Sequence, residues 1–324
     1  MVERRARLTA YFKKHTIHSG VRMLIKRLFQ HIRSLNACAM PGDGGSDIPL
    51  LFPLGHFYSP IANTADIRAR EAKIWAEVDS MPGIDLRVDN QLALAKALKP
   101  YTADIDWPTD QPNDPTRYFY NNDQFPMPDA EFLYAALQHF RPKKMIEVGC
   151  GFSSLVTAEV NRKFFQNTIE FSCIEPYPRQ FLVNGVEGIT QLVQQKVEDV
   201  DLGFFERLGP GDILFIDSSH VSKVGSDVNY LFFEVIPRLR PGVIVHIHDV
   251  FLPDEYPKNW MIDQGRNWNE QYLARAFLQF NHHWDVMWAG HFMGTRYPAD
   301  IASTFTRLPE RIGHGSSLWL RRLS

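Results

Sequence analysis

Residues 144–154 read Lys-Met-Ile-Glu-Val-Gly-Cys-Gly-Phe-Ser-Ser, a short apolar run followed by two glycines and small residues. The run Lys144–Val148 predicts a β-strand, and a helix is expected to begin at about Ser153. Glycine lets the chain turn sharply and approach a ligand closely, and the first turn of a helix offers free N–H groups. This strand, turn and helix therefore predict a nucleotide-cofactor site.

Two acids narrow the choice of nucleotide. Glu147 stands at the end of the first strand, where a carboxylate suits a cationic or hydroxyl-bearing group better than a pyrophosphate. Glu175 follows a second predicted strand, Ile169–Ile174, where it can accept hydrogen bonds from both ribose hydroxyls. The dinucleotide fingerprint Gly-x-Gly-x-x-Gly needs a third glycine at position 154, which is a serine here. S-adenosylmethionine is therefore favoured over NAD.

The segment 147–151, Glu-Val-Gly-Cys-Gly, resembles the first motif of class I S-adenosylmethionine-dependent methyltransferases, and Glu175 resembles their ribose-binding acid. The resemblance covers roughly residues 117–324. Three further segments, Ile174–Pro178, Phe215–His220 and His246–Asp249, are most similar to bacterial O-methyltransferases of small molecules and saccharides. The resemblance implies contacts to the methionine moiety, the ribose and, around position 197, the adenine. The cofactor residues so assigned are Glu147, Gly149, Gly151, Glu175, Val197 and Glu198. Position in the chain adds two more candidates: Ser153, where the helix after the glycines begins, and Tyr120, which lies just before the helix expected at 129–140.

The pattern after Pro128 alternates strands and helices, which predicts a mostly parallel sheet covered on both faces. Helices are expected at about 129–140, 224–239 and 268–280, and strands at 212–216, 243–248, 284–292 and 316–320. The expected fold is α/β, a Rossmann-like seven-stranded sheet of the class I methyltransferase type with an N-terminal helical and loop region. The predicted domains are a basic helical N-terminus at 1–40, an accessory region at 41–116 and a methyltransferase domain at 117–324. Residues 65–80 look helical, and 101–128 look like a long loop.

Polar side chains end two of these strands. Asp217 and His220 follow the strand at 212–216, and the strand at 243–248 ends in His246, His248 and Asp249. Ligands of parallel α/β sheets bind at the carboxyl ends of the strands, so these positions are candidates for the reaction centre. His246 is expected to be a buried strand histidine bonded to a backbone group. The catalytic candidates are Asp217, His220, His248 and Asp249.

Two mechanisms remain open at these strand ends. By resemblance to metal-dependent catechol-type O-methyltransferases, Asp217, His248 and Asp249 would hold Mg²⁺ or Mn²⁺, although those enzymes have Asp-Asn at the last two positions. A bound metal would lower the pKa of the acceptor hydroxyl. Without a metal, a neutral His220 or His248 could take the hydroxyl proton as a general base.

The charge distribution singles out the N-terminus. The net charge is −2, yet residues 1–40 carry nine Lys or Arg against one acid, and apolar residues recur at helical spacing between Val21 and Leu35. This basic amphipathic helix could contact an anionic membrane surface or pack on its own domain or another subunit, and we favour packing. Three widely spaced cysteines and no long apolar run predict a reducing, cytoplasmic location.

A small-molecule or saccharide acceptor is expected to bind loops such as 251–267, with Tyr118, Tyr256 and Trp260 among the aromatic candidates. A nucleic-acid acceptor is not expected, because the region after residue 40 is acidic overall. Homo-oligomerisation stays open. The competing functions are an NAD-dependent oxidoreductase, a metal-dependent hydroxylase or hydrolase at Asp217, His248 and Asp249, and a non-catalytic scaffold.

Overall fold

The computed structural model describes residues 51–78, 80–305 and 315–324. Contacts divide the chain into two units, 1–63 and 64–324, and the sheet with its flanking helices belongs to the second. The predicted basic helix at 21–35 lies outside the described residues. The aromatic ring pair of Phe52 and His56, stacked at 4.7 Å, belongs to the first unit.

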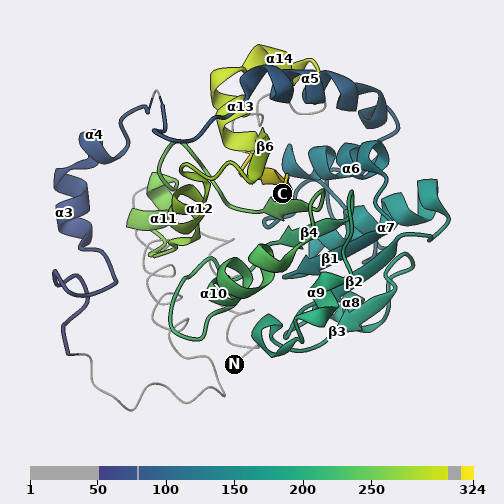
Figure 1. Cartoon of the computed structure of the whole chain (residues 1–324), viewed down its shortest axis with the longest axis horizontal. Helices are drawn as coiled ribbons and strands as arrows, with labels where there is room; N and C mark the ends of the chain where they lie inside the picture. The colour runs from purple at the N-terminus through teal and green to yellow at the C-terminus, as the bar shows by residue number, and fades with distance from the viewer. Residues whose placement is uncertain (1–50, 79, 306–314) are drawn as a thin grey trace, which may run out of the picture. The chain divides into compact units, whose positions relative to one another are not determined.

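A seven-stranded sheet forms the centre of the second unit, in the order β3-β2-β1-β4-β5-β7-β6 (Figure 1). Strands β1 to β5 are parallel, and β7 is antiparallel to both of its neighbours. This arrangement confirms the predicted Rossmann-like class I methyltransferase fold. The strands are β1 Lys144–Val148, β2 Glu170–Ile174, β3 Gln191–Val193, β4 Ile213–Ile216, β5 Ile244–Ile247, β6 Trp284–Ala289 and β7 Leu318–Arg322.

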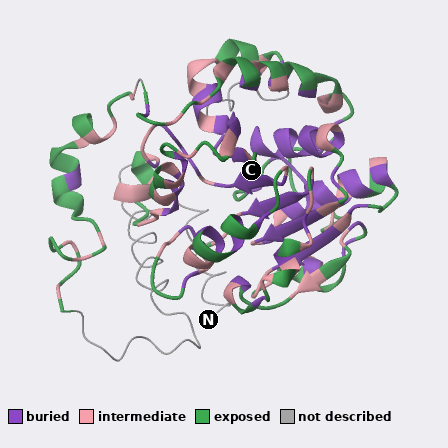
Figure 2. Ribbon diagram, in the orientation of Figure 1, coloured by how far each residue is buried: buried purple, intermediate pink, exposed green. Residues whose placement is uncertain are grey.

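Helices flank the sheet and keep its central strands from water. Every residue of β4 and β5 is buried, as expected for parallel strands covered on both faces, and Figure 2 shows the buried residues concentrated in the sheet. The helices are α3 Thr64–Ala69, α4 Glu71–Ile74, α5 Val88–Leu98, α6 Asp129–Phe140, α7 Phe152–Phe165, α8 Gln180–Val183, α9 Gly203–Glu206, α10 Asp227–Tyr230, α11 Lys258–Ile262, α12 Glu270–Leu278, α13 Gly290–Arg296 and α14 Pro298–Ala302.

Several predicted elements differ from the structure. The helix expected at 65–80 is two short helices, α3 and α4, that end at Ile74. The helix expected at 224–239 is α10 followed by a π turn, Leu231–Val235, and a 3-10 turn, Ile236–Arg238. Pro237 in that last turn has no N–H to continue a helix. The strand expected at 284–292 stops at Ala289, where α13 begins.

Residues 64–116 belong to the same compact unit as the sheet. Helix α5, which the sequence pattern did not reveal, contacts α6, α14 and β6. The loop predicted at 101–128 is irregular, yet Trp107, Tyr118 and Phe125 within it are buried. The compact unit therefore begins at Thr64, whereas the sequence placed the start of the methyltransferase domain at residue 117.

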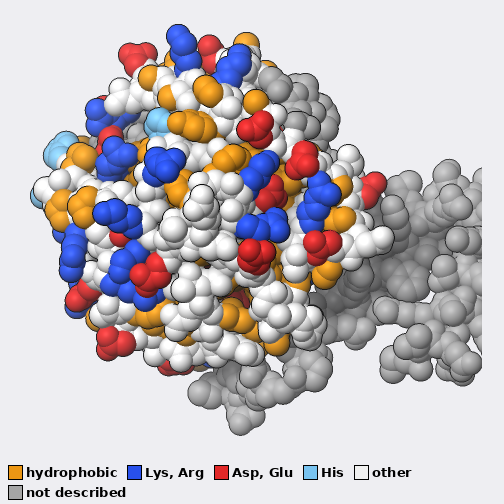
Figure 3. Space-filling model, turned by 90° about the vertical axis from the view of Figure 1, so that its right-hand side faces the viewer, with side chains coloured by type: hydrophobic (Ala, Val, Ile, Leu, Met, Phe, Trp, Pro, Cys, Tyr) orange, Lys and Arg blue, Asp and Glu red, His pale blue; other side chains and the backbone are white. Residues whose placement is uncertain are grey.

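The surface carries both signs of charge. On the face drawn in Figure 3, Lys and Arg side chains are interspersed with Asp and Glu over the described residues. Among the described residues, no helix has both the length and the apolar character that crossing a bilayer requires.

Candidate functional site

The glycine turn joins the carboxyl ends of three neighbouring strands. Gly149 follows β1 with φ of +79°, its N–H donates to the carbonyl of Ile174 at 3.0 Å, and the N–H of Asp217 donates to the carbonyl of Val148 at 2.9 Å. A Cβ on Gly149 would lie 1.8 Å from the carbonyl oxygen of Asp217. Only glycine lets the turn pack this closely against the end of β4.

Glu147 lies fully buried beneath this turn. One carboxylate oxygen accepts a hydrogen bond from the Ser153 hydroxyl, and the other, Oε2, has no partner. Burial raises the pKa of Glu147 to about 8, and the charges of Asp217 and Glu175 add to the effect. A buried carboxyl with an unpaired oxygen fits a cationic or hydroxyl-bearing group of a cofactor, because such a partner would stabilise its charged form.

Glu175 is held at the end of β2 by backbone donors. Its Oε2 accepts from the N–H of Cys150 at 3.1 Å, and its Oε1 accepts from the N–H of Tyr177 at 2.8 Å. These bonds fix the carboxylate at the edge of a cavity of about 450 Å³. A fixed carboxylate in this position can accept further hydrogen bonds from the two hydroxyls of a ribose.

The predicted cofactor residues divide into two groups. The ones that line the smaller cavity are Gly149, Glu175, Val197 and Glu198, together with Lys223, Ser226 and Asp227, which sequence reasoning missed. The ones that do not line it are Tyr120, Glu147, Gly151 and Ser153. The hydroxyl of Tyr120 donates to Oε1 of Glu131 at 2.9 Å, and its ring packs against Trp107 inside the core. Sequence proximity to a helix thus gave little information on where this side chain points.

A larger cavity of about 1320 Å³ lies beside the smaller one, and Asp217, Ser218 and Ser219 line both. These three residues follow β4 directly. Aromatic side chains of Trp75, Trp260 and Trp268 line the larger cavity, with polar groups among them. Two cavities with a common wall at a strand end can hold two reactants next to each other. Of the predicted aromatic candidates, Trp260 lines it, whereas Tyr118 and Tyr256 do not.

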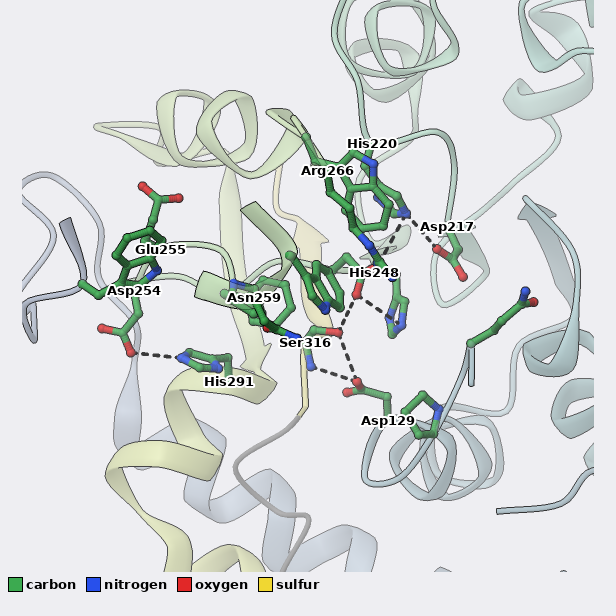
Figure 4. Close-up of a pocket in the computed structure, with 18 of the residues that line it drawn as sticks. Asp129, Asp217, His220, His248, Asp254, Glu255, Asn259, Arg266, His291 and Ser316 are labelled. Atoms are coloured by element: carbon green, nitrogen blue, oxygen red, sulfur yellow. Dashed lines mark hydrogen bonds and ion pairs between the residues drawn. The ribbon is translucent and has the colours of Figure 1, made fainter. Parts of the chain in front are cut away.

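The wall of the larger cavity holds a cluster of acids around His220 (Figure 4). Its Nε2 lies 3.3 Å from Oδ1 of Asp217 and 3.6 Å from Oδ2 of Asp249, and its Nδ1 lies 2.9 Å from Oε2 of the buried Glu270. His220 and Asp249 both have positive φ, of 60° and 55°. Such backbone strain in non-glycine residues tends to occur at functional sites.

His248 stands at the margin of this cluster. Its Nε2 lies 3.9 Å from Oδ1 of Asp249, and its Nδ1 has no partner. The group whose ligand atoms lie within 4.8 Å of one another is Asp217, His220 and Asp249. The structure therefore brings together two of the three predicted metal ligands, Asp217 and Asp249, and the third member of the group is His220 instead of the predicted His248. Glu270, which comes from α12, left no signal in the sequence pattern.

Charge coupling within the cluster sets its protonation. For His220, burial would lower the pKa, but hydrogen bonds to Asp217 and Glu270 and the charge of Asp249 raise it well above its usual value. Burial raises the pKa of Asp249, while the imidazoles of His248 and His220 outweigh burial and lower the pKa of Asp217. An imidazolium beside an ionised Asp217 is therefore the favoured state near neutral pH.

His246 differs from its expected environment. It is fully buried in β5, as predicted, but neither ring nitrogen has a hydrogen-bond partner. Its ring stacks on Phe215 at 3.8 Å between centroids and an angle of 14°. Burial lowers its pKa well below the usual value. The prediction of a backbone hydrogen bond was wrong, because the strand already pairs its carbonyl groups with β4 and β7.

Comparisons with known proteins agree with the fold. The family model described as a methyltransferase domain matches residues 146–250. An uncharacterized protein from Archaeoglobus fulgidus is 41% identical over 167 residues, which are 50% of this chain and 76% of that protein. The match to the methyltransferase family model supports methyl transfer and gives no support to the dehydrogenase, hydroxylase or hydrolase alternatives.

Two solved structures are also similar at low identity. A putative protein-L-isoaspartate O-methyltransferase from Plasmodium falciparum, in complex with S-adenosyl-L-homocysteine, is 12% identical with a TM-score of 0.26 and covers 57% of this chain and 81% of its own. An O-methyltransferase from Bacillus cereus, in complex with the same ligand, is 12% identical with a TM-score of 0.33 and covers 80% of this chain and 97% of its own.

Proposed function

Because this chain carries a methyltransferase domain and belongs to one family with its archaeal relative, we propose that it is an S-adenosylmethionine-dependent O-methyltransferase of a small molecule or saccharide. The observation that carries the proposal is the common wall of the two cavities at Asp217, Ser218 and Ser219. The smaller cavity, with Glu175 on its rim, would take the cofactor. The larger cavity would take the acceptor.

The residues of the wall suggest how a hydroxyl would be activated. Bound S-adenosylmethionine supplies an electrophilic methyl group on its sulfonium sulfur. Asp249 lines the larger cavity only, and its raised pKa makes it a stronger base than an ordinary carboxylate. We assign it the acceptor hydroxyl proton, which would leave as the oxygen attacks the methyl carbon; the carbon–sulfur bond would break, with S-adenosylhomocysteine as the leaving group. His220, held by Glu270, keeps Asp249 and Asp217 in place; its raised pKa makes it a poor base near neutral pH.

The cofactor assignment is tested by calorimetric titration of the full chain. We expect S-adenosylhomocysteine to bind with a dissociation constant in the micromolar range, typical of cofactor sites, and NAD to bind at least about a hundredfold more weakly. The reason is that Ser154 stands where the dinucleotide fingerprint needs its third glycine, whereas Glu175 on the rim of the smaller cavity can accept hydrogen bonds from the ribose hydroxyls of S-adenosylhomocysteine. NAD binding in the absence of S-adenosylhomocysteine binding would overturn the proposed function.

A divalent metal fits the cluster of Asp217, His220 and Asp249 by donor chemistry, since two carboxylates and one imidazole suit Mn²⁺. A metal held there would lower the pKa of the acceptor hydroxyl, and Asp249 would then act as a ligand instead of as the base. The charges of the cluster also allow a metal ion to bind, because its positive charge would replace that of the proton that the acids hold on His220.

The metal site is tested by titrating Mn²⁺ and counting bound ions by electron paramagnetic resonance. One ion per chain is expected, and His220→Ala should weaken its binding by about tenfold or more, the loss expected for one ligand. His248→Ala is the matched control, because its nearest ring nitrogen lies 3.9 Å from Asp249 outside the cluster, and it should change binding little. If His248→Ala abolished Mn²⁺ binding and His220→Ala did not, the ligand set predicted from the sequence, with His248, would be the right one.

A further inference from the structure

Arg266 lies on the wall of the larger cavity, in the loop between α11 and α12. The carbon at the centre of its guanidinium is 4.0 Å from the ring centroid of Trp260 and 4.7 Å from that of Trp268. The two indoles meet edge to face at 5.2 Å. A guanidinium held over an indole face keeps the N–H donors at its edge free. These contacts therefore fix the position of Arg266 and leave its donors able to bind a ligand.

Arg296, the other arginine among the described residues that line the cavity, already has a partner. It pairs with Asp254 at 2.8 Å, and His291 contacts the same carboxylate at 3.0 Å. Among the described residues, the guanidinium of Arg266 has no hydrogen bond and no ion pair, although Asp249 lies near enough for its charge to act on it. Partial burial without a counter-ion is costly for a cation, so the site favours binding of an anion.

Arg266 also lies close to the reaction centre. The ring of Trp268, which Arg266 contacts, is 4.3 Å from the ring of His220. Figure 4 draws both the Arg266 and the His220 side chains at the wall of the cavity, which both of them line. A group bound at the Arg266 edge would therefore be near a hydroxyl placed against Asp249.

We propose that Arg266 forms an anion subsite that binds a carboxylate or phosphate group of the acceptor, next to the hydroxyl that is methylated. The planar fork of N–H donors matches either group in a two-point contact. The proposal rests on the proposed function in taking the larger cavity as the acceptor site. It narrows the acceptor class to anionic small molecules, such as acidic or phosphorylated sugars.

The test compares three sugars of similar size by calorimetry on the full chain: D-glucose, D-glucuronate and D-glucose 6-phosphate. At least one anionic sugar should bind about tenfold or more tightly than glucose, as expected for a charge-assisted hydrogen bond. The tighter of the two anions identifies the group. Arg266→Gln should remove the preference, and Arg266→Lys should retain part of it, because the charge remains while the fork is lost.

Two controls make the result specific. Arg238→Gln removes an arginine that is exposed and paired with Glu234 at 2.8 Å outside both cavities, and it should keep the full preference. Arg266→Gln should bind S-adenosylhomocysteine within about threefold of the unmodified protein, because Arg266 does not line the smaller cavity. Equal binding of all three sugars to the unmodified protein, or an anion preference that persists in Arg266→Gln, would overturn the subsite. Since the sugars are titrated without cofactor, failure of the cofactor assignment would not be mistaken for failure of the subsite.

Discussion

Asp249→Ala is expected to lower the rate of methyl transfer by about 10³-fold, the typical contribution of a general base, while S-adenosylhomocysteine affinity changes by about threefold or less. We expect the rate and the cofactor affinity to respond differently because of where Asp249 lies. Asp249 lines the larger cavity and not the smaller one, and its carboxylate lies 3.6 Å from His220 and accepts from the Ser316 hydroxyl at 3.0 Å. Steady-state rates with labelled S-adenosylmethionine and calorimetry with S-adenosylhomocysteine measure the two quantities.

Asp254→Asn provides the matched control for this experiment. Asp254 lines the same cavity but pairs separately with His291 and Arg296. The Asp254→Asn substitution should therefore lower the rate of methyl transfer by about tenfold or less. An Asp249→Ala enzyme that kept a rate within about tenfold of the unmodified protein would remove Asp249 from the proton-transfer role. Rate loss accompanied by loss of cofactor affinity would instead indicate damage to the common wall.

Gly149→Ala is expected to abolish measurable S-adenosylhomocysteine binding and to lower the free energy of unfolding by about 3 kcal/mol or more. An added Cβ would lie 1.8 Å from the carbonyl oxygen of Asp217 and 2.7 Å from its carbonyl carbon, which are backbone atoms that cannot rotate away. The clash adds to the cost of a left-handed φ for a residue with a Cβ. To make room, β1 and β4 must separate where the two cavities meet. Chemical denaturation and calorimetry check both effects.

Gly211→Ala separates strain from steric clash. Gly211 has a similar φ, +85°, but no atom lies within 4 Å of the position that its Cβ would take. The substitution should therefore lower the free energy of unfolding by only about 1 kcal/mol, which is the penalty for the backbone conformation alone, and leave cofactor affinity unchanged. If both variants lost the same stability, backbone conformation rather than close packing would explain the glycine at position 149.

Several elements could be predicted from the sequence because local information was sufficient. Strands β1, β2, β4 and β5 are short, mainly apolar runs followed directly by a glycine, an acid or a histidine, and their bounds agree with the structure to within one residue. Strand β3 was harder to locate, since Gln191–Val193 is three residues long and none of them is buried. Helix α5 was missed because an extended coil and an amphipathic helix differ little over such a short and mixed segment.

For the candidate site, the sequence alone determined which kinds of residue stand at the carboxyl ends of β1, β2, β4 and β5. Tertiary structure decided which of them meet. The strand order places β4 beside β5, so the turns after them bring His220 against Asp249, and α12 supplies Glu270 from far along the chain. That no described residue forms an ion pair with Arg266 is also visible only in three dimensions. Side-chain pairing depends on long-range packing, whereas strand and turn propensity depends on neighbours in the chain.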